Sequence, residues 1–110
     1  MRTNPKHVSP LRYPGGKTKL SPMITELIEQ VWGGTAPPVF VEPFAGGAGL
    51  GLKLLTQGII SRLHLNDLDQ GVYAFWESCI HDTDNLCDQI TYSPVTVEEW
   101  HKQHHIYMNP

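Results

Sequence analysis

A strand end followed by a cluster of glycines is the part of this sequence most able to do chemistry. Residues 39–41 are apolar, and Glu42 and Pro43 close the predicted strand because proline cannot donate to a sheet ladder. Glycines follow at positions 46, 47, 49 and 51. Glycine permits positive φ and lets a ligand approach the backbone closely, and the next helix would direct its N–H groups to the same place. The stretch is typical of the opening of a nucleotide-binding α/β unit.

The spacing of these glycines excludes the two commonest phosphate-binding loops. A dinucleotide fingerprint needs glycines at relative positions one, three and six, but counting from Gly47 or Gly49 puts a leucine at the sixth position. A phosphate loop ends in Gly-Lys-Ser/Thr, but Leu52 stands where that lysine belongs, and Gly16-Lys17-Thr18 lacks the earlier glycine. Backbone amides and an acidic strand end, without a lysine, suit a ligand that carries no triphosphate.

A second acidic strand end lies 21 residues after Gly46. Residues 63–65 are expected to form a short strand that ends at Asn66 and Asp67. An acid about 20 residues past the glycine turn, at the tip of the next strand, is placed to hydrogen-bond ribose hydroxyls, and we favour this role for Asp67. For Asp69 we favour capping of the following helix. Asn66 either orients Asp67 or only ends the strand.

Three blocks of sequence together resemble the N-terminal half of the Dam-type (D12 class) DNA adenine-N6 methyltransferases. They read Leu-Arg-Tyr-Pro-Gly-Gly-Lys at 11–17, Phe-Val-Glu-Pro-Phe-Ala-Gly-Gly-Ala-Gly at 40–49, and Leu-Asn-Asp-Leu-Asp at 65–69. The blocks occur in the family's order and at similar spacing. The resemblance implies S-adenosylmethionine as the ligand. This cofactor has an adenosine and a sulfonium but no phosphate, in agreement with the failed phosphate-loop templates.

The resemblance also implies roles for individual residues. Tyr13 and Lys17 would help to form the cofactor pocket, and Arg12 would contact DNA; the alternative for each is an exposed loop side chain. Glu42 would either meet the methionine amino group of the cofactor or hold the loop. Phe44 would either stack on the adenine or pack in the core. Close approach of the backbone to the cofactor is implied at three glycines: Gly46, Gly47 and Gly49.

The predicted strands and helices that position these residues form an α/β unit. A helix is predicted from Ser21 as N-cap, with Pro22 at the first helical position, and a second helix from Leu50 to the glycine at Gly58. We therefore expect a partial Rossmann-like methyltransferase fold, consisting of the N-terminal strands and helices of a mostly parallel sheet.

Further helices are predicted in the C-terminal part of the chain. Apolar residues at helical spacing from Val72 indicate an amphipathic helix, with Phe75 and Trp76 together on its core face. A break is expected over residues 81–84, then a short helix over residues 84–90. A capping box at residues 96–99 opens a last helix that runs toward position 108.

Composition and charge narrow the class of protein. No apolar run approaches the roughly 18 residues of a membrane span, no secretory segment is recognisable, and Cys79 and Cys87 are expected to be reduced thiols of a cytoplasmic protein. The net charge is −3, yet five of the eight Lys and Arg residues precede Glu26, the first acid. This basic segment is either a surface that contacts DNA phosphates or a solvated tail. The histidines at 101, 104 and 105 have no acidic or cysteine partner nearby, so no metal site is predicted.

The family's catalytic loop, Asp/Asn/Ser-Pro-Pro-Tyr/Phe, is missing from these 110 residues. Residues 36–39 read Ala-Pro-Pro-Val and lack both its polar and its aromatic residue. We therefore expect residues 1–110 to be a single cofactor-binding portion of an enzyme that methylates a flipped adenine in duplex DNA. The catalytic and target-recognition segments would come from a missing C-terminal part, and a second chain or a homodimer could complete the sheet. The alternative is a noncatalytic module that binds S-adenosylmethionine or DNA.

Overall fold

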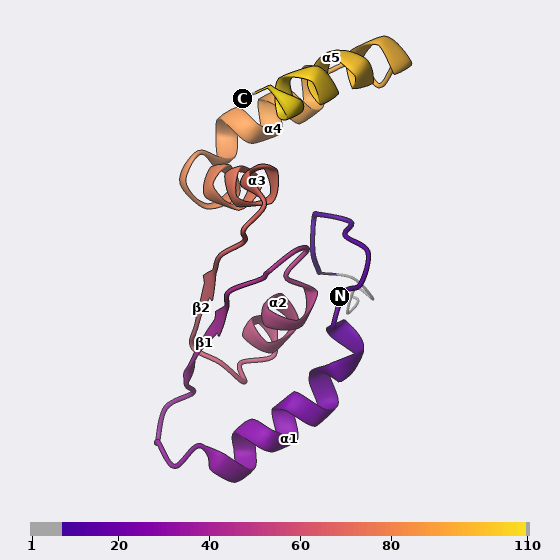
Figure 1. Ribbon diagram of the computed structural model, residues 1–110. Coiled ribbons are helices and arrows are strands. Elements are labelled where there is room, and N and C mark those ends of the chain that lie inside the picture. The colour runs from indigo at the N-terminus through magenta and orange to yellow at the C-terminus, as the bar shows by residue number, and fades with distance from the viewer. Residues whose placement is uncertain (1–7, 110) are drawn as a thin grey trace, which may run out of the picture. The chain divides into compact units, whose positions relative to one another are not determined.

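The computed structural model describes residues 8–109 of the 110-residue chain. The chain divides into two compact units, residues 1–68 and residues 69–110. We call them the sheet unit and the helical unit (Figure 1).

Two parallel strands form the centre of the sheet unit. Strand β1 (Val39–Glu42) pairs with β2 (Arg62–Leu65) in a register that sets Val39 opposite Arg62 and Glu42 opposite Leu65. The connection between them contains helix α2 (Gly49–Thr56), and helix α1 (Ser21–Val31) precedes β1. Both predicted strands and their parallel direction are thus confirmed.

One face of the sheet is covered and the other is open. Because side chains alternate along a strand, Phe40 and Leu63 pack with α1 and α2 around a core of Leu50, Leu54 and Ile60. Val39 and Val41 point to the opposite face and are exposed. The core therefore lies between the sheet and the two helices, which holds the carboxyl ends of β1 and β2 next to the first turn of α2.

The start of α1 differs from the prediction. A short 3-10 helix, η1 (Thr18–Leu20), runs directly into α1, so Leu20 is the N-cap residue and Ser21 is already helical. The N-cap residue Leu20 makes no side-chain capping hydrogen bond, and Ser21 is buried. Pro22 lies in the first turn, as expected. The prediction of Ser21 as N-cap was wrong because η1 extends the helical path upstream of Ser21. No local sequence signal indicates η1.

The helical unit contains α3 (Gln70–His81), α4 (Thr83–Tyr92) and α5 (Val97–Met108). Asp69 caps α3 by accepting hydrogen bonds from the amides of Gly71 (2.8 Å) and Val72 (3.1 Å), and Thr96 caps α5. Both caps were predicted. The expected break over residues 81–84 narrows to a single residue, Asp82, between α3 and α4.

Aromatic side chains make contacts within the helical unit. Trp76 is buried and Phe75 is half-buried, and their rings meet edge to face at 5.1 Å between centroids. The predicted core role is thus confirmed for Trp76. The hydroxyl of Tyr107 donates to Asp69 at 2.6 Å. This bond and the amide of Val72 lower the pKa of Asp69. Asp69 therefore joins the start of α3 to the end of α5.

Mixed helices and a small parallel sheet are compatible with an α/β methyltransferase fold. Within residues 8–109, no helix has both the length and the apolar character required to cross a membrane. The same residues contain no group of three or more His, Cys, Asp or Glu side chains arranged to hold a metal ion. Of the α5 histidines, His104 stacks on Trp100 at 4.8 Å.

Candidate functional site

The tip of β2 fastens the glycine turn that follows β1. The backbone of Asn66 donates to the carbonyl of Glu42 (2.9 Å) and accepts from the amide of Ala45 (2.9 Å). The side chain of Asn66 donates to the carbonyl of Pro43 (3.2 Å), and the carboxylate of Asp67 accepts from the amide of Gly46 (2.9 Å). Residues that are more than 20 positions apart in sequence thus form one site at the carboxyl ends of the two strands.

Two residues of the turn have left-handed backbone conformations. Gly46 and Ala48 both have φ of +52°, and the amide of Ala48 donates to the carbonyl of Ala45 at 2.7 Å. Positive φ is natural for glycine but uncommon for alanine, and such strain is often found at functional sites. Ala48 is also the N-cap position of α2, and its side chain is buried. A left-handed, buried alanine thus lies at the junction between the glycine turn and α2.

The N-terminal segment of residues 9–18 lies against the glycines. A Cβ atom added to Gly46 would come within 2.8 Å of the Tyr13 ring, and one added to Gly47 within 2.8 Å of the Leu11 carbonyl oxygen. A Cβ at Gly49 would collide with the hydroxyl of Thr18. The first and second sequence blocks are therefore in contact. The chain's own packing requires these three glycines to be small, and close approach of a cofactor to them remains a prediction.

Glu42 points toward the first turn of α2. A Cβ on Gly51 would lie 2.6 Å from the Oε2 atom of Glu42 and 2.6 Å from a methyl group of Leu63. This Oε2 atom is buried and has no hydrogen-bond partner among the described residues. Burial raises the pKa of Glu42, and the Gly51 amide and the Lys17 ammonium oppose the rise more weakly. Both roles proposed for Glu42, holding the loop and meeting the cofactor's amino group, remain predictions.

We expect Glu42→Gln to be more stable than the wild type at pH 7. Because the pKa is raised in the folded state, the folded protein binds the proton more tightly, so Glu42 costs stability as the pH rises above its ordinary pKa of 4.5. The neutral amide avoids this cost, and its advantage should become small at pH 4, where Glu42 is mostly protonated in both states. Urea unfolding at the two pH values measures this. A variant that is less stable at pH 7 would mean that the charge of Glu42 is needed at α2.

The remaining predicted site residues lie on the surface around the turn. Phe44 is 75% exposed, so it does not belong to the core, and the stacking alternative remains a prediction. Tyr13 is 46% exposed although its ring covers Gly46. Arg12 and Lys17 are exposed on the same N-terminal segment. The structure therefore brings together all three sequence blocks at one end of the sheet.

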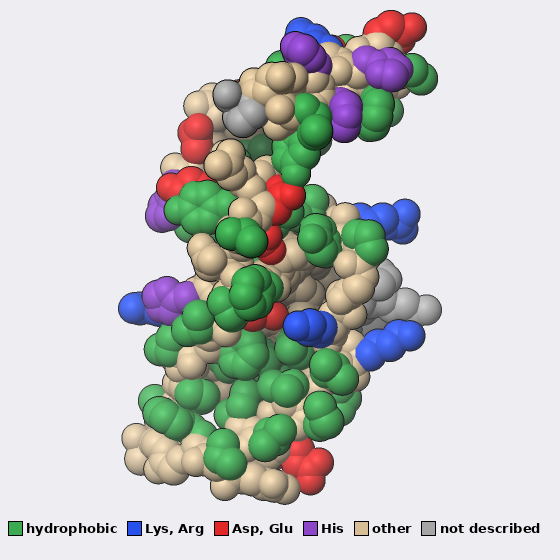
Figure 2. Space-filling model, in the orientation of Figure 1, with side chains coloured by type: hydrophobic (Ala, Val, Ile, Leu, Met, Phe, Trp, Pro, Cys, Tyr) green, Lys and Arg blue, Asp and Glu red, His purple; other side chains and the backbone are tan. Residues whose placement is uncertain are grey.

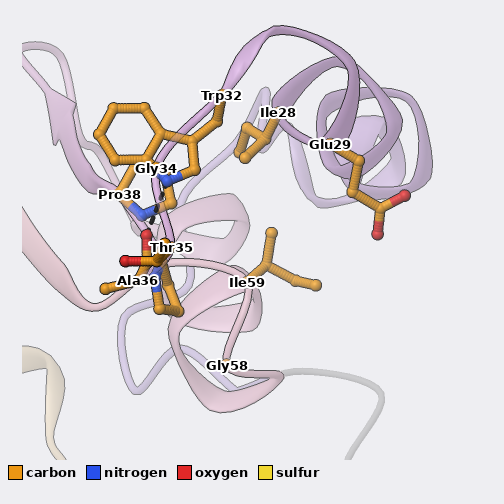
Figure 3. A pocket seen from close by; sticks show the side chains of 10 residues that line it. Ile28, Glu29, Trp32, Gly34, Thr35, Ala36, Pro38, Gly58 and Ile59 are labelled. Atoms are coloured by element: carbon orange, nitrogen blue, oxygen red, sulfur yellow. Dashed lines mark hydrogen bonds between the residues drawn. The ribbon is translucent and has the colours of Figure 1, made fainter.

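A shallow pocket lies at the opposite end of the sheet unit (Figure 3). It is lined by the end of α1, by residues 34–38 and by Gly58 and Ile59, which precede the strands rather than follow them. The indole N–H of Trp32 donates to the Ala36 carbonyl at 2.6 Å and closes the loop at its edge. Ligands of open parallel sheets bind at the carboxyl ends of the strands, so this pocket is separate from the candidate site.

Charge is distributed unequally between the two units. Residues 1–68 contain seven Lys and Arg against four Asp and Glu, whereas residues 69–110 contain one against seven. In Figure 2 several Lys and Arg side chains lie over the surface of the sheet unit. Arg2 and Lys6, part of the predicted basic segment, lie outside the described residues. Positive charge thus accompanies the unit that carries the candidate site.

The model of a family described as D12 class N6 adenine-specific DNA methyltransferase matches residues 13–108. The chain belongs to this family. The match begins at Tyr13, includes the glycine turn and Asp67, and continues through α5. It confirms the family that the three sequence blocks indicated. No significant match was found among curated proteins or among solved structures.

Sequence reasoning did not identify two features of the site. The side chain of Asn66 fastens the carbonyl of Pro43, where the sequence left its role open. The left-handed conformation of Ala48 had no sequence signal, since alanine usually indicates a helix. An asparagine directly after a strand is a usable signal for the first feature, because its short amide readily bonds nearby backbone.

Proposed function

We propose that this chain supplies the cofactor-binding half of a site-specific DNA adenine-N6 methyltransferase, with S-adenosylmethionine as methyl donor and a flipped adenine in duplex DNA as acceptor. One observation carries the proposal. The three blocks typical of the family converge at the carboxyl ends of β1 and β2, where open parallel sheets bind their ligands. The family match over residues 13–108 supports the same reaction class.

The residues at the turn fit this cofactor. The exposed Phe44 ring is suited to stack on a flat adenine, and the carboxylate of Asp67 is suited to accept hydrogen bonds from ribose hydroxyls. Lys17 offers a cation for the cofactor's carboxylate. Glu42 has an unpartnered carboxylate oxygen, a favourable environment for the cofactor's positive charges. The cofactor, when bound, supplies an electrophilic methyl group on sulfonium; the chain's own residues bind and orient it.

The sheet unit is the proposed contact surface for DNA. It carries the excess of positive charge, and Arg12 is exposed on the segment beside the glycine turn. The helical unit, with one basic and seven acidic residues, would be repelled by phosphates. Beyond the pairing of β1 with β2, the described residues contain no further strand. We propose that a C-terminal part, a second chain or a homodimer extends the sheet, and that the protein acts in the cytoplasm.

Phe44→Ala is expected to weaken S-adenosylmethionine binding about two- to tenfold, since aromatic stacking is worth about 0.5–1.5 kcal/mol. Because the ring is 75% exposed, the free energy of unfolding should hardly change. Calorimetric titration of the cofactor into the wild type and the variant measures this. Val31→Ala is a matched control, since Val31 is also 75% exposed but lies at the end of α1.

Absence of binding by folded wild-type protein, both alone and together with the proposed C-terminal part or second chain, would refute the proposed cofactor site. The noncatalytic alternative is separated by a second measurement. An assembly that includes the proposed part should transfer labelled methyl groups to adenine in duplex DNA. Cofactor binding without any transfer by that assembly would favour the noncatalytic module instead.

A further inference from the structure

Donors and acceptors at the tip of β2 form hydrogen bonds with acceptors and donors of the glycine turn. The backbone and side chains of this tip engage the carbonyls of Glu42 and Pro43 and the amides of Ala45 and Gly46. Phe44 lies in the middle of this run, and none of these four bonds involves it. Its ring is the most exposed large apolar side chain of the turn. The turn is thus fastened on both sides of the residue that projects from it.

The contact with Pro43 depends on the side chain of Asn66. The strand pairing of β1 ends at Glu42, and the carbonyl of Pro43 lies beyond the last pair of the register. The backbone of Asn66 is already used by Glu42 and Ala45, so its side-chain amide is the group that reaches Pro43. An amide donor at position 66 therefore faces a carbonyl, whereas the carboxylate acceptor at position 67 faces an N–H group. The two adjacent side chains have opposite and matched polarity.

We propose that Asn66 is a positioning residue for the candidate site: its side-chain amide holds the carbonyl of Pro43 and so fixes the turn that presents Phe44. The inference rests on the proposed function only where it predicts an effect of Asn66 on cofactor binding. The fastening itself is a property of the ligand-free chain, and it can be tested without any cofactor.

The first test measures amide hydrogen exchange of the whole chain by NMR without ligand. Asn66→Ala removes the donor, and Asn66→Asp replaces it with an acceptor that repels the Pro43 carbonyl. We expect exchange at Ala45 and Gly46 to accelerate about two- to tenfold in Asn66→Ala, as for loss of one exposed hydrogen bond, and further in Asn66→Asp. The core amide of Leu54 should keep its protection. Gln57→Ala, which removes another exposed carboxamide of the same unit, should leave all three amides unchanged.

The second test measures S-adenosylmethionine affinity for the same variants. The expected order is wild type, then Asn66→Gln, which keeps a donor on a longer arm, then Asn66→Ala and last Asn66→Asp. Unchanged exchange at Ala45 and Gly46 would overturn the proposal, and so would equal acceleration at Leu54, which would indicate general destabilisation. If the wild type binds no cofactor, either alone or with the proposed further part, the proposed function fails, but the exchange measurement still decides the role of Asn66.

Discussion

Gly47→Ala is expected to lower the free energy of unfolding of the sheet unit by about 1–3 kcal/mol, the usual cost of overpacking. The added methyl group would lie 2.8 Å from the backbone carbonyl oxygen of Leu11 and 3.2 Å from Cβ of Tyr13. A backbone atom cannot rotate away as a side chain can, so the N-terminal segment must shift away from the turn. Cofactor affinity should fall with it, because Tyr13 and Lys17 belong to that segment. Urea unfolding and calorimetric titration measure the two effects.

The chain offers matched controls for this substitution. A Cβ on Gly33 would meet no atom within 4 Å, and one on Gly16 would make only an ordinary contact, at 3.9 Å from the Tyr13 carbonyl oxygen. Both alanine variants should stay within about 0.5 kcal/mol of the wild type. If Gly47→Ala matched these controls in stability and in affinity, the N-terminal segment would not be held against the glycine turn in solution.

Local signals were sufficient to predict most elements of the fold. The change from strand to glycine turn, the caps at Asp69 and Thr96, and the helical spacing around Trp76 each involve residues within one or two turns of one another. Such short-range patterns reflect backbone preferences that operate before tertiary packing. The family resemblance added the expectation of S-adenosylmethionine as the ligand, which stays a prediction.

The geometry of the site depended on contacts that no local pattern specifies. The packing of Tyr13 on Gly46 joins segments more than 30 positions apart, and the sequence offered no reason to place the Glu42 side chain against Gly51. The glycines were predicted to make room for a ligand; in the structure they make room for the N-terminal segment. Ser21 failed as a cap for a similar reason, since η1 extends the helical path upstream.

Asp67 offers the most informative substitution at the site, because one observed interaction and one proposed interaction both involve its carboxylate. Its carboxylate accepts from the Gly46 amide, 21 residues away, and in the proposed function it also binds the cofactor's ribose. Asp67→Ala removes both interactions, and S-adenosylmethionine affinity should fall about tenfold or more, since a charge-assisted hydrogen bond is worth about 1.5–3 kcal/mol. Asp67→Asn keeps an oxygen that can accept from Gly46 but loses the charge.

The two variants separate holding the loop from binding the cofactor. If both roles are real, Asp67→Asn should retain the stability of the sheet unit and the slow exchange of the Gly46 amide, yet bind the cofactor more weakly than the wild type. Asp69→Ala is the internal control, because this acid is engaged by α3 and Tyr107 in the helical unit and should leave cofactor affinity unchanged. Wild-type affinity in Asp67→Asn would mean that the charge of Asp67 does not contribute to binding. Weak binding by Asp67→Ala would then follow from the loosened glycine turn alone.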